Sequence, residues 1–95
     1  MRKSIHSSEY ASLRKRLAGM RAEAGLTQRS LAKLLDAPPS WVAKVELGER
    51  RIDLIEFAWF CNACGSSPVA EAGELLRGWA RPRKAAIRSA GRPPA

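Results

Sequence analysis

The sequence has very little of the chemistry that catalytic and metal sites usually need. Its 95 residues include one histidine, His6, and two cysteines, Cys61 and Cys64. No combination of serine, histidine and aspartate suggests a nucleophilic triad, and no glycine-rich loop suggests a phosphate cradle. We therefore expect no enzymatic activity and no cofactor.

The two cysteines form a C-x-x-C spacing, which is typical of zinc sites and of redox sites. A structural zinc site needs four ligands, and His6 is the only other soft candidate in the chain. A redox pair would follow a strand in a βαβ unit, but no segment has a strand pattern. Because both cysteines fall on the inward face of a helical pattern, we predict small buried core residues and no metal site.

Long apolar runs are absent as well. No segment approaches the roughly 20 apolar residues that a membrane span requires, and the first residues lack the apolar core of a secretory signal. These two absences predict a soluble, cytoplasmic protein without a membrane partner.

Positive charge is abundant but unevenly distributed. The chain has 17 Lys and Arg against 9 Asp and Glu, a formal net charge of +8 and a pI near 10.5, which favours an anionic partner. Residues 8–79 hold ten basic and nine acidic residues, so the excess lies at the two ends. We expect a flexible N-terminal arm, residues 1–7, one folded domain, residues 8–80, and a disordered basic tail, residues 81–95.

Helical spacing of apolar residues and capping signals predict five short helices. Their expected limits, caps and stops included, are Ser7 or Ser8 to Gly25, Thr27 to Leu35, Pro39 to Gly48, Asp53 to Gly65, and Ser67 to Trp79. Asp53 and Glu56 form a variant of the capping box. The expected inward residues of the second and fourth helices are Leu31, Leu34, Leu35, Leu54, Phe57, Cys61 and Cys64.

The second and third predicted helices are separated by only a few residues, so they must meet through a tight turn. The third helix presents a short polar edge on the side away from Val42 and Val45. Two helices joined in this way form the helix-turn-helix arrangement, in which the second helix lies in the DNA major groove.

Several motifs make this arrangement more specific. They are R-x-x-x-G-L-T-Q at 21–28, L-A-x-x-L at 31–35, V-x-x-V-E-x-G-E-R at 42–50, and a closing helix followed by Gly65 and Pro68. In this order and spacing, residues 9–68 resemble the DNA-binding domain of the Cro/C1-type (XRE) helix-turn-helix family. The resemblance implies an all-α, five-helix, lambda-repressor-like domain. It also implies docking on double-stranded DNA through the second and third helices, usually as a dimer.

The chain departs from the family pattern at the turn. Asp36 stands where the family commonly has glycine, and aspartate tolerates the left-handed backbone conformation. Pro38 and Pro39 stand where the family commonly has a serine cap and a polar side chain. We expect Pro39 to lie in the first turn of the third helix, where its missing N–H has no intrahelical partner to lose.

The resemblance places the base-contacting edge at Pro39, Ser40, Trp41 and Lys44. Pro39 has no hydrogen-bonding side chain, so direct readout depends on Ser40 and on Lys44, which can donate to guanine O6 or N7 or to a phosphate. Trp41 has two interpretations. Its indole either contacts a thymine methyl or a sugar edge, or packs over the turn on the prolines.

Two groups of residues are expected to contact phosphates. Thr27, Gln28 and Arg29 lie at the amino end of the second helix, where backbone N–H groups and the helix dipole attract anions. Arg50 and Arg51 follow the third helix, and each is either a phosphate contact or an ion-paired surface charge.

Two polar residues are expected to support the third helix. By the resemblance, Gln28 also braces the backbone and the recognition helix. Glu46 is expected to pair with an internal arginine such as Arg21, because an anion facing DNA would be repelled.

The fourth and fifth helices carry more apolar side chains than one buried face requires. We expect a two-fold dimer contact that places two recognition helices about one DNA turn, roughly 34 Å, apart. The alternative is a monomer whose tail folds back over these side chains. The residues concerned are Ile55, Trp59, Leu75, Leu76 and Trp79.

The sequence therefore predicts a nucleoid-associated transcriptional regulator, most simply a homodimeric repressor on a palindromic operator. The basic arm and tail would strengthen DNA binding without selecting a sequence. Two alternatives stay open. One is an antitoxin that binds a toxin through the last two helices and represses its own promoter, and the other is a protein-interaction adaptor that does not bind DNA.

Overall fold

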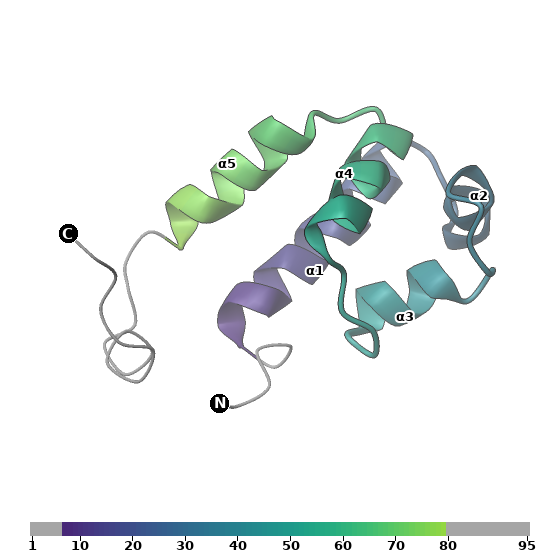
Figure 1. Cartoon of the computed structure of the whole chain (residues 1–95), viewed down its shortest axis with the longest axis horizontal. Helices are drawn as coiled ribbons and strands as arrows, with labels where there is room; N and C mark the ends of the chain where they lie inside the picture. Colours follow the sequence, from purple (N-terminus) through teal and green to yellow (C-terminus); the bar gives the residue numbers. More distant parts are fainter. Residues whose placement is uncertain (1–6, 80–95) are drawn as a thin grey trace.

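The computed structural model describes residues 7–79, which form five helices (Figure 1). In chain order they are α1 (Ser8–Glu23), α2 (Gln28–Leu34), α3 (Trp41–Leu47), α4 (Leu54–Ala63) and α5 (Pro68–Gly78). This range contains no strand, and none of its helices is long and apolar enough to cross a bilayer. The predicted all-α, five-helix architecture is confirmed. The expected arm and tail lie outside the described residues except for Ser7, which caps α1.

Side-chain caps fix the helix starts where the sequence predicts them. Thr27 Oγ1 accepts from the Ser30 N–H at 3.0 Å, and Ser30 Oγ accepts from the Thr27 N–H at 2.8 Å. Asp53 and Glu56 form the same reciprocal pair at the start of α4, and Ser67 caps α5. These bonds satisfy donors that the first helical turn leaves unpaired, so even short helices begin at defined residues.

The turn between α2 and α3 differs in one detail from its prediction. Asp36 has φ 54°, the left-handed conformation expected for it. However, α3 begins at Trp41, so Pro39 precedes the helix and does not lie in its first turn. The Trp41 N–H donates to the Pro38 carbonyl oxygen at 2.9 Å, and Ser40 has φ −83° and ψ −7°. These values match a type I turn with Pro39 at its second position, where the fixed φ of proline is favoured.

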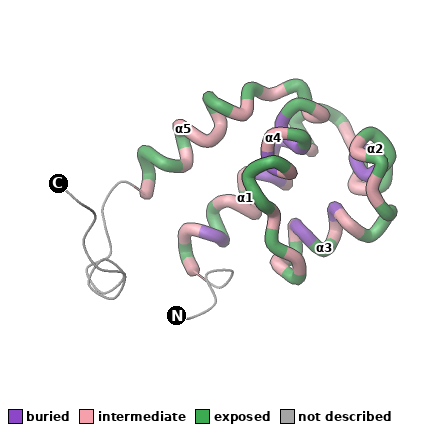
Figure 2. The backbone as a smooth tube through the Cα atoms, viewed as in Figure 1, coloured by how far each residue is buried: buried purple, intermediate pink, exposed green. Residues whose placement is uncertain are grey.

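The core lies where α1, α2, α3 and α4 meet (Figure 2). Two expected core residues are exposed instead, Leu34 by 62% and Leu54 by 78%. Leu34 is the last residue of α2 and Leu54 the first of α4, and helical spacing identifies the inward face of a helix but not where its cover ends. The most deeply buried side chains are Leu17, Met20, Leu31, Ala32, Val42, Val45, Phe60 and Cys61.

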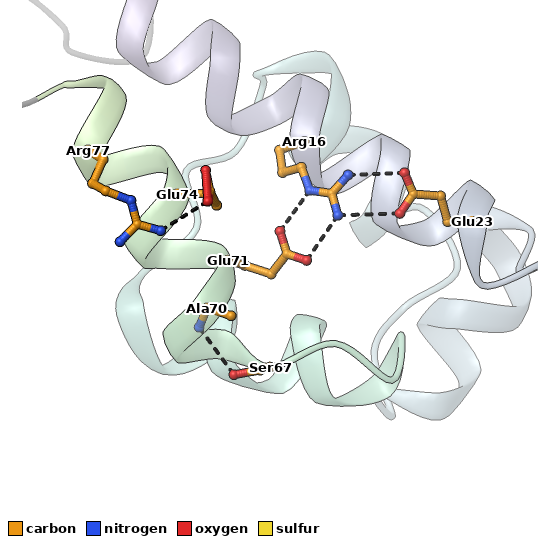
Figure 3. A network of polar contacts seen from close by, with 7 residues as sticks. All are labelled: Arg16, Glu23, Ser67, Ala70, Glu71, Glu74 and Arg77. Atoms are coloured by element: carbon orange, nitrogen blue, oxygen red, sulfur yellow. Dashed lines mark hydrogen bonds and ion pairs between the residues drawn. The ribbon is translucent and has the colours of Figure 1, made fainter.

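Helix α5 packs on α4 but contains no buried residue. Its fixed points are polar. Arg16 of α1 donates to both carboxylate oxygens of Glu71 at 2.7 and 2.9 Å and also pairs with Glu23 at 3.1 Å (Figure 3). Hydrogen bonding to Arg16 lowers the pKa of Glu71. Just after α5, Trp79 Nε1 donates to Ser12 Oγ of α1 at 3.0 Å.

Candidate nucleic-acid interface

A shallow hollow of about 400 Å³ lies along α2 and the turn that follows it. It brings Thr27 and Arg29, two predicted phosphate contacts, next to Pro39 at the start of the predicted base-contacting edge. Lys33 also lines the hollow, and both Arg29 and Lys33 are exposed. Because these two cations are four residues apart on one helix, they lie on the same side of α2 and give the hollow a positive rim.

The outer edge of α3 is exposed while its opposite side is fully buried. Ser40 and Lys44 are exposed, whereas Val42 and Val45 have no exposed surface. Leu47, three residues after Lys44, is 66% exposed. Ser40 does not cap α3 with its side chain. Positions 40, 44 and 47 follow helical spacing, so one edge presents a hydroxyl, an ammonium group and an aliphatic side chain.

Trp41 is partly buried and packs against the core. The guanidinium carbon of Arg50 lies 5.2 Å from the centroid of its ring, and Trp41 lines a second hollow together with Pro38. These contacts favour the interpretation in which Trp41 packs at the turn, since much of the indole is already engaged by the protein.

A polar network behind α3 fixes its position on the domain. Glu46 accepts hydrogen bonds from Arg21 Nε at 2.7 Å, Arg21 Nη2 at 3.0 Å and Gln28 Nε2 at 2.8 Å. Arg21 Nη1 also donates to the Leu26 carbonyl oxygen at 2.9 Å, and the bond to Glu46 raises the pKa of Arg21. Glu46 therefore pairs with Arg21, and Gln28 links α2 to α3, as the sequence predicted.

The two arginines after α3 are engaged within the protein. Arg50 donates to both carboxylate oxygens of Glu56 at 2.9 and 2.8 Å and to the Arg51 carbonyl oxygen at 2.6 Å. This pairing raises the pKa of Arg50 and lowers that of Glu56. The guanidinium carbon of Arg51 lies 5.7 Å from the Tyr10 ring centroid. A phosphate would have to compete with Glu56, so Arg50 is an ion-paired residue in the DNA-free protein.

The predicted dimer residues separate into two groups. Ile55 and Trp59 on α4 are 62% and 58% exposed, and Leu76 on α5 is 59% exposed. Leu75 instead packs against the core, and Trp79 is partly buried with its indole N–H bonded to α1. Ile55, Trp59 and Leu76 are therefore the residues of this set that offer apolar surface to a partner.

The two cysteines lie in or beside the core. Cys61 is fully buried, and Cys64 is partly buried against it. Burial raises the pKa of Cys61 to about 11 and also raises that of Cys64. Both thiols therefore stay protonated at neutral pH, as expected for core residues and not for metal-bound or reactive thiolates. Within residues 7–79, no three histidine, cysteine or acidic side chains gather as a metal site, and His6 lies outside that range.

The sequence analysis missed Lys33 and Leu47 as parts of the exposed surface. Their spacing from Arg29 and Lys44 was visible in the sequence, but both positions also fit an ordinary solvent-facing side chain. Only the geometry of the turn shows that Lys33 shares a hollow with Pro39.

The chain is similar to known helix-turn-helix proteins. A family profile described as a helix-turn-helix domain matches residues 12–75, which include α2, the turn and α3. Among solved structures, the chain is 42% identical to an XRE-family like protein from Pseudomonas syringae pv. tomato str. DC3000. That alignment has a TM-score of 0.73 and covers 78% of this chain and 90% of the other. No curated protein is significantly similar to the chain.

Proposed function

Because the chain belongs to the XRE-type helix-turn-helix family of DNA-binding regulators, we propose that it is a sequence-specific repressor that binds a palindromic operator in double-stranded DNA as a homodimer. The observation that carries this proposal is the exposed edge of α3, held from behind by Glu46. A helix fixed on one side and polar on the other can enter the major groove without rearrangement. The protein would act on the cytoplasmic nucleoid by occluding a promoter.

Base recognition is assigned mainly to Lys44 and Ser40. Lys44 donates to guanine O6 or N7, while Ser40 bonds to several base edges and so discriminates less. Pro39 and Leu47 offer apolar contacts at the two ends of the same edge, for which the thymine methyl group is the matching partner. Trp41 contributes by packing against the turn and holding the edge in place.

Phosphate binding is assigned to the amino end of α2. The capping box occupies the amides of Thr27 and Ser30, so the amides of Gln28 and Arg29 are the first-turn donors left for an anion. The side chains of Arg29 and Lys33 add positive charge from the rim of the hollow. Arg51 is kept as a phosphate contact, whereas Arg50 would first have to leave Glu56. The cations of the arm and tail, which lie outside the described residues, would add non-specific affinity by releasing counterions.

The dimer contact is assigned to Ile55, Trp59 and Leu76, with Leu75 and Trp79 supporting them from the partly buried side. A two-fold contact here would set two α3 helices roughly 34 Å apart, the spacing of successive major grooves. Light scattering of the purified chain should report a dimer that Trp59→Asp dissociates. A monomer would instead leave this surface to a different protein, such as a toxin or co-regulator.

Selection of bound fragments from random duplex DNA tests the proposal. We expect a palindromic consensus, and Lys44→Ala should change the preferred base at one position of each half-site. Lys33→Ala should instead weaken binding to all duplexes alike and make the log–log salt slope about 0.9 shallower per lost phosphate contact. If the protein shows no preference among duplexes at moderate salt, sequence-specific DNA binding is rejected and the adaptor hypothesis is favoured.

A further inference from the structure

A second hollow lies on the other side of the turn from the candidate interface. It has a volume of about 210 Å³ and is formed where the end of α2, the turn, the start of α3 and the middle of α4 converge (Figure 1). We call it the tryptophan hollow. It is lined by Leu35, Asp36, Ala37, Pro38, Trp41, Glu56 and Trp59.

The lining of the tryptophan hollow suits a guanidinium group. It combines two indoles, from Trp41 and Trp59, with two carboxylates, from Asp36 and Glu56. A guanidinium group stacks on an indole face and donates to a carboxylate in the same plane, so this combination recognises arginine better than lysine.

One half of the hollow already contains such a group. Arg50 lies over the Trp41 ring at 5.2 Å and forms two hydrogen bonds with Glu56. The other half consists of Asp36 and Trp59, which is 58% exposed. Among residues 7–79, no cation pairs with Asp36 and none lies over Trp59. The second indole and carboxylate thus repeat the chemistry of the first without its arginine.

The chain itself supplies a matching segment. Residues 80–95 follow Trp79 and contain five basic residues, of which four are arginines, together with three prolines. Sixteen residues span up to about 50 Å when extended, whereas a domain of this size is about 30 Å across, so the segment can reach the hollow. Proline and arginine are the residues that aromatic grooves most often bind in extended peptides. The arginines of the segment are Arg81, Arg83, Arg88 and Arg92.

We propose that the tryptophan hollow binds an arginine side chain of the chain's own C-terminal segment, with Trp59 providing the stacking face and Asp36 the carboxylate. This inference does not depend on the proposed function. If the protein also binds DNA, the docked arginine is withdrawn from the phosphates, so DNA and the hollow compete for the same segment.

The test uses the full chain and nuclear magnetic resonance of the indole and backbone N–H groups. Replacing all four arginines of the segment by glutamine should shift the Trp59 indole signal and the amide signals of Asp36 and its neighbours. Asp36→Asn should cause matching shifts in residues 80–95, and asparagine keeps the fold because it also tolerates the left-handed conformation. The matched control is Glu49→Gln, which removes one exposed carboxylate outside the hollow and should leave residues 80–95 unchanged.

Free N-acetylarginine amide, added to the four-glutamine variant, should restore the wild-type position of the Trp59 signal, and Asp36→Asn in that variant should abolish the effect. Trp59 and Asp36 signals that are identical in the wild type and the four-glutamine variant would overturn the proposal. Equal effects of Asp36→Asn and Glu49→Gln would also overturn it, because they would indicate general charge attraction. Signals that change on dilution would overturn docking within one chain.

Discussion

Helices α3 and α5 are both short and attached to the same core, but they are held in different ways. Helix α3 buries Val42 and Val45 completely, and Glu46 ties it to two other helices. Helix α5 buries no residue and is linked to α1 by Arg16–Glu71, with Trp79 bonding to the same helix just beyond it. The difference indicates that α3 is presented in one fixed orientation, whereas α5 can be loosened without disturbing the core.

The largest expected effect comes from breaking the support of α3. Glu46→Ala leaves Arg21 and Gln28 without their partner in a site where the Glu46 side chain is 8% exposed. We expect the free energy of unfolding in urea to fall by about 2–3 kcal/mol, because a partly buried cation loses its counter-charge. Glu49→Ala, which removes a nearby exposed carboxylate, should change it by less than about 0.5 kcal/mol. Equal losses in the two variants would mean that the network does not hold α3.

A smaller effect is expected from breaking the support of α5. Glu71→Gln removes the charge that pairs with Arg16, whose side chain is 35% exposed. We expect a loss of about 1 kcal/mol, since solvent partly screens this pair. Amide hydrogen exchange should accelerate in α5 and not in α3. The control Glu74→Gln breaks the exposed pair with Arg77, so faster exchange in α5 for this variant as well would contradict the assignment to Glu71.

Acid should loosen α5 in the same way. The pKa of Glu71 is lowered in the folded protein, so its contribution to stability is complete above the unfolded pKa of about 4.3 and is lost as the pH falls through the folded value. Below about pH 4, the indole N–H signal of Trp79 should therefore move as its bond to Ser12 is lost. Glu71→Gln should show the moved signal already at neutral pH. A Trp79 signal that follows pH equally in both proteins would exclude Glu71 as the cause.

The smallest effect concerns the far end of α5. Ser12→Ala removes the acceptor of the Trp79 indole N–H at an exposed site of α1. We expect the free energy of unfolding to change by less than about 0.5 kcal/mol, because an exposed donor exchanges its partner for water. Hydrogen exchange should quicken only in the last turn of α5. A loss as large as that of Glu71→Gln would show that Trp79, and not the ion pair, fixes the helix.

Local chemistry was predictable from the sequence. The caps Thr27 and Asp53 and the left-handed Asp36 depend on a few neighbouring residues, so their roles could be assigned before the fold was known. The pairing of Glu46 with Arg21 was also predictable, because the family resemblance placed both residues at one helix contact.

Features that depend on where helices end were not predictable. Leu34 and Leu54 have inward helical spacing but lie beyond the cover of their neighbours. Whether Arg50 would contact a phosphate or form an ion pair was left open, and only the close approach of α4 shows its pairing with Glu56. Lys33 was missed because the shape of the turn, and not its spacing, places it beside Pro39.

The raised pKa of Cys61 makes the chain its own reporter of global opening. A thiol that is fully buried and titrates near pH 11 reacts with an alkylating reagent only when the surrounding helices separate. The rate of labelling at Cys61 therefore measures how often the whole core opens, with no dye or added probe. Fraying of α5 alone leaves Phe60 and Leu17 in place, so the label distinguishes loss of one helix from loss of the domain.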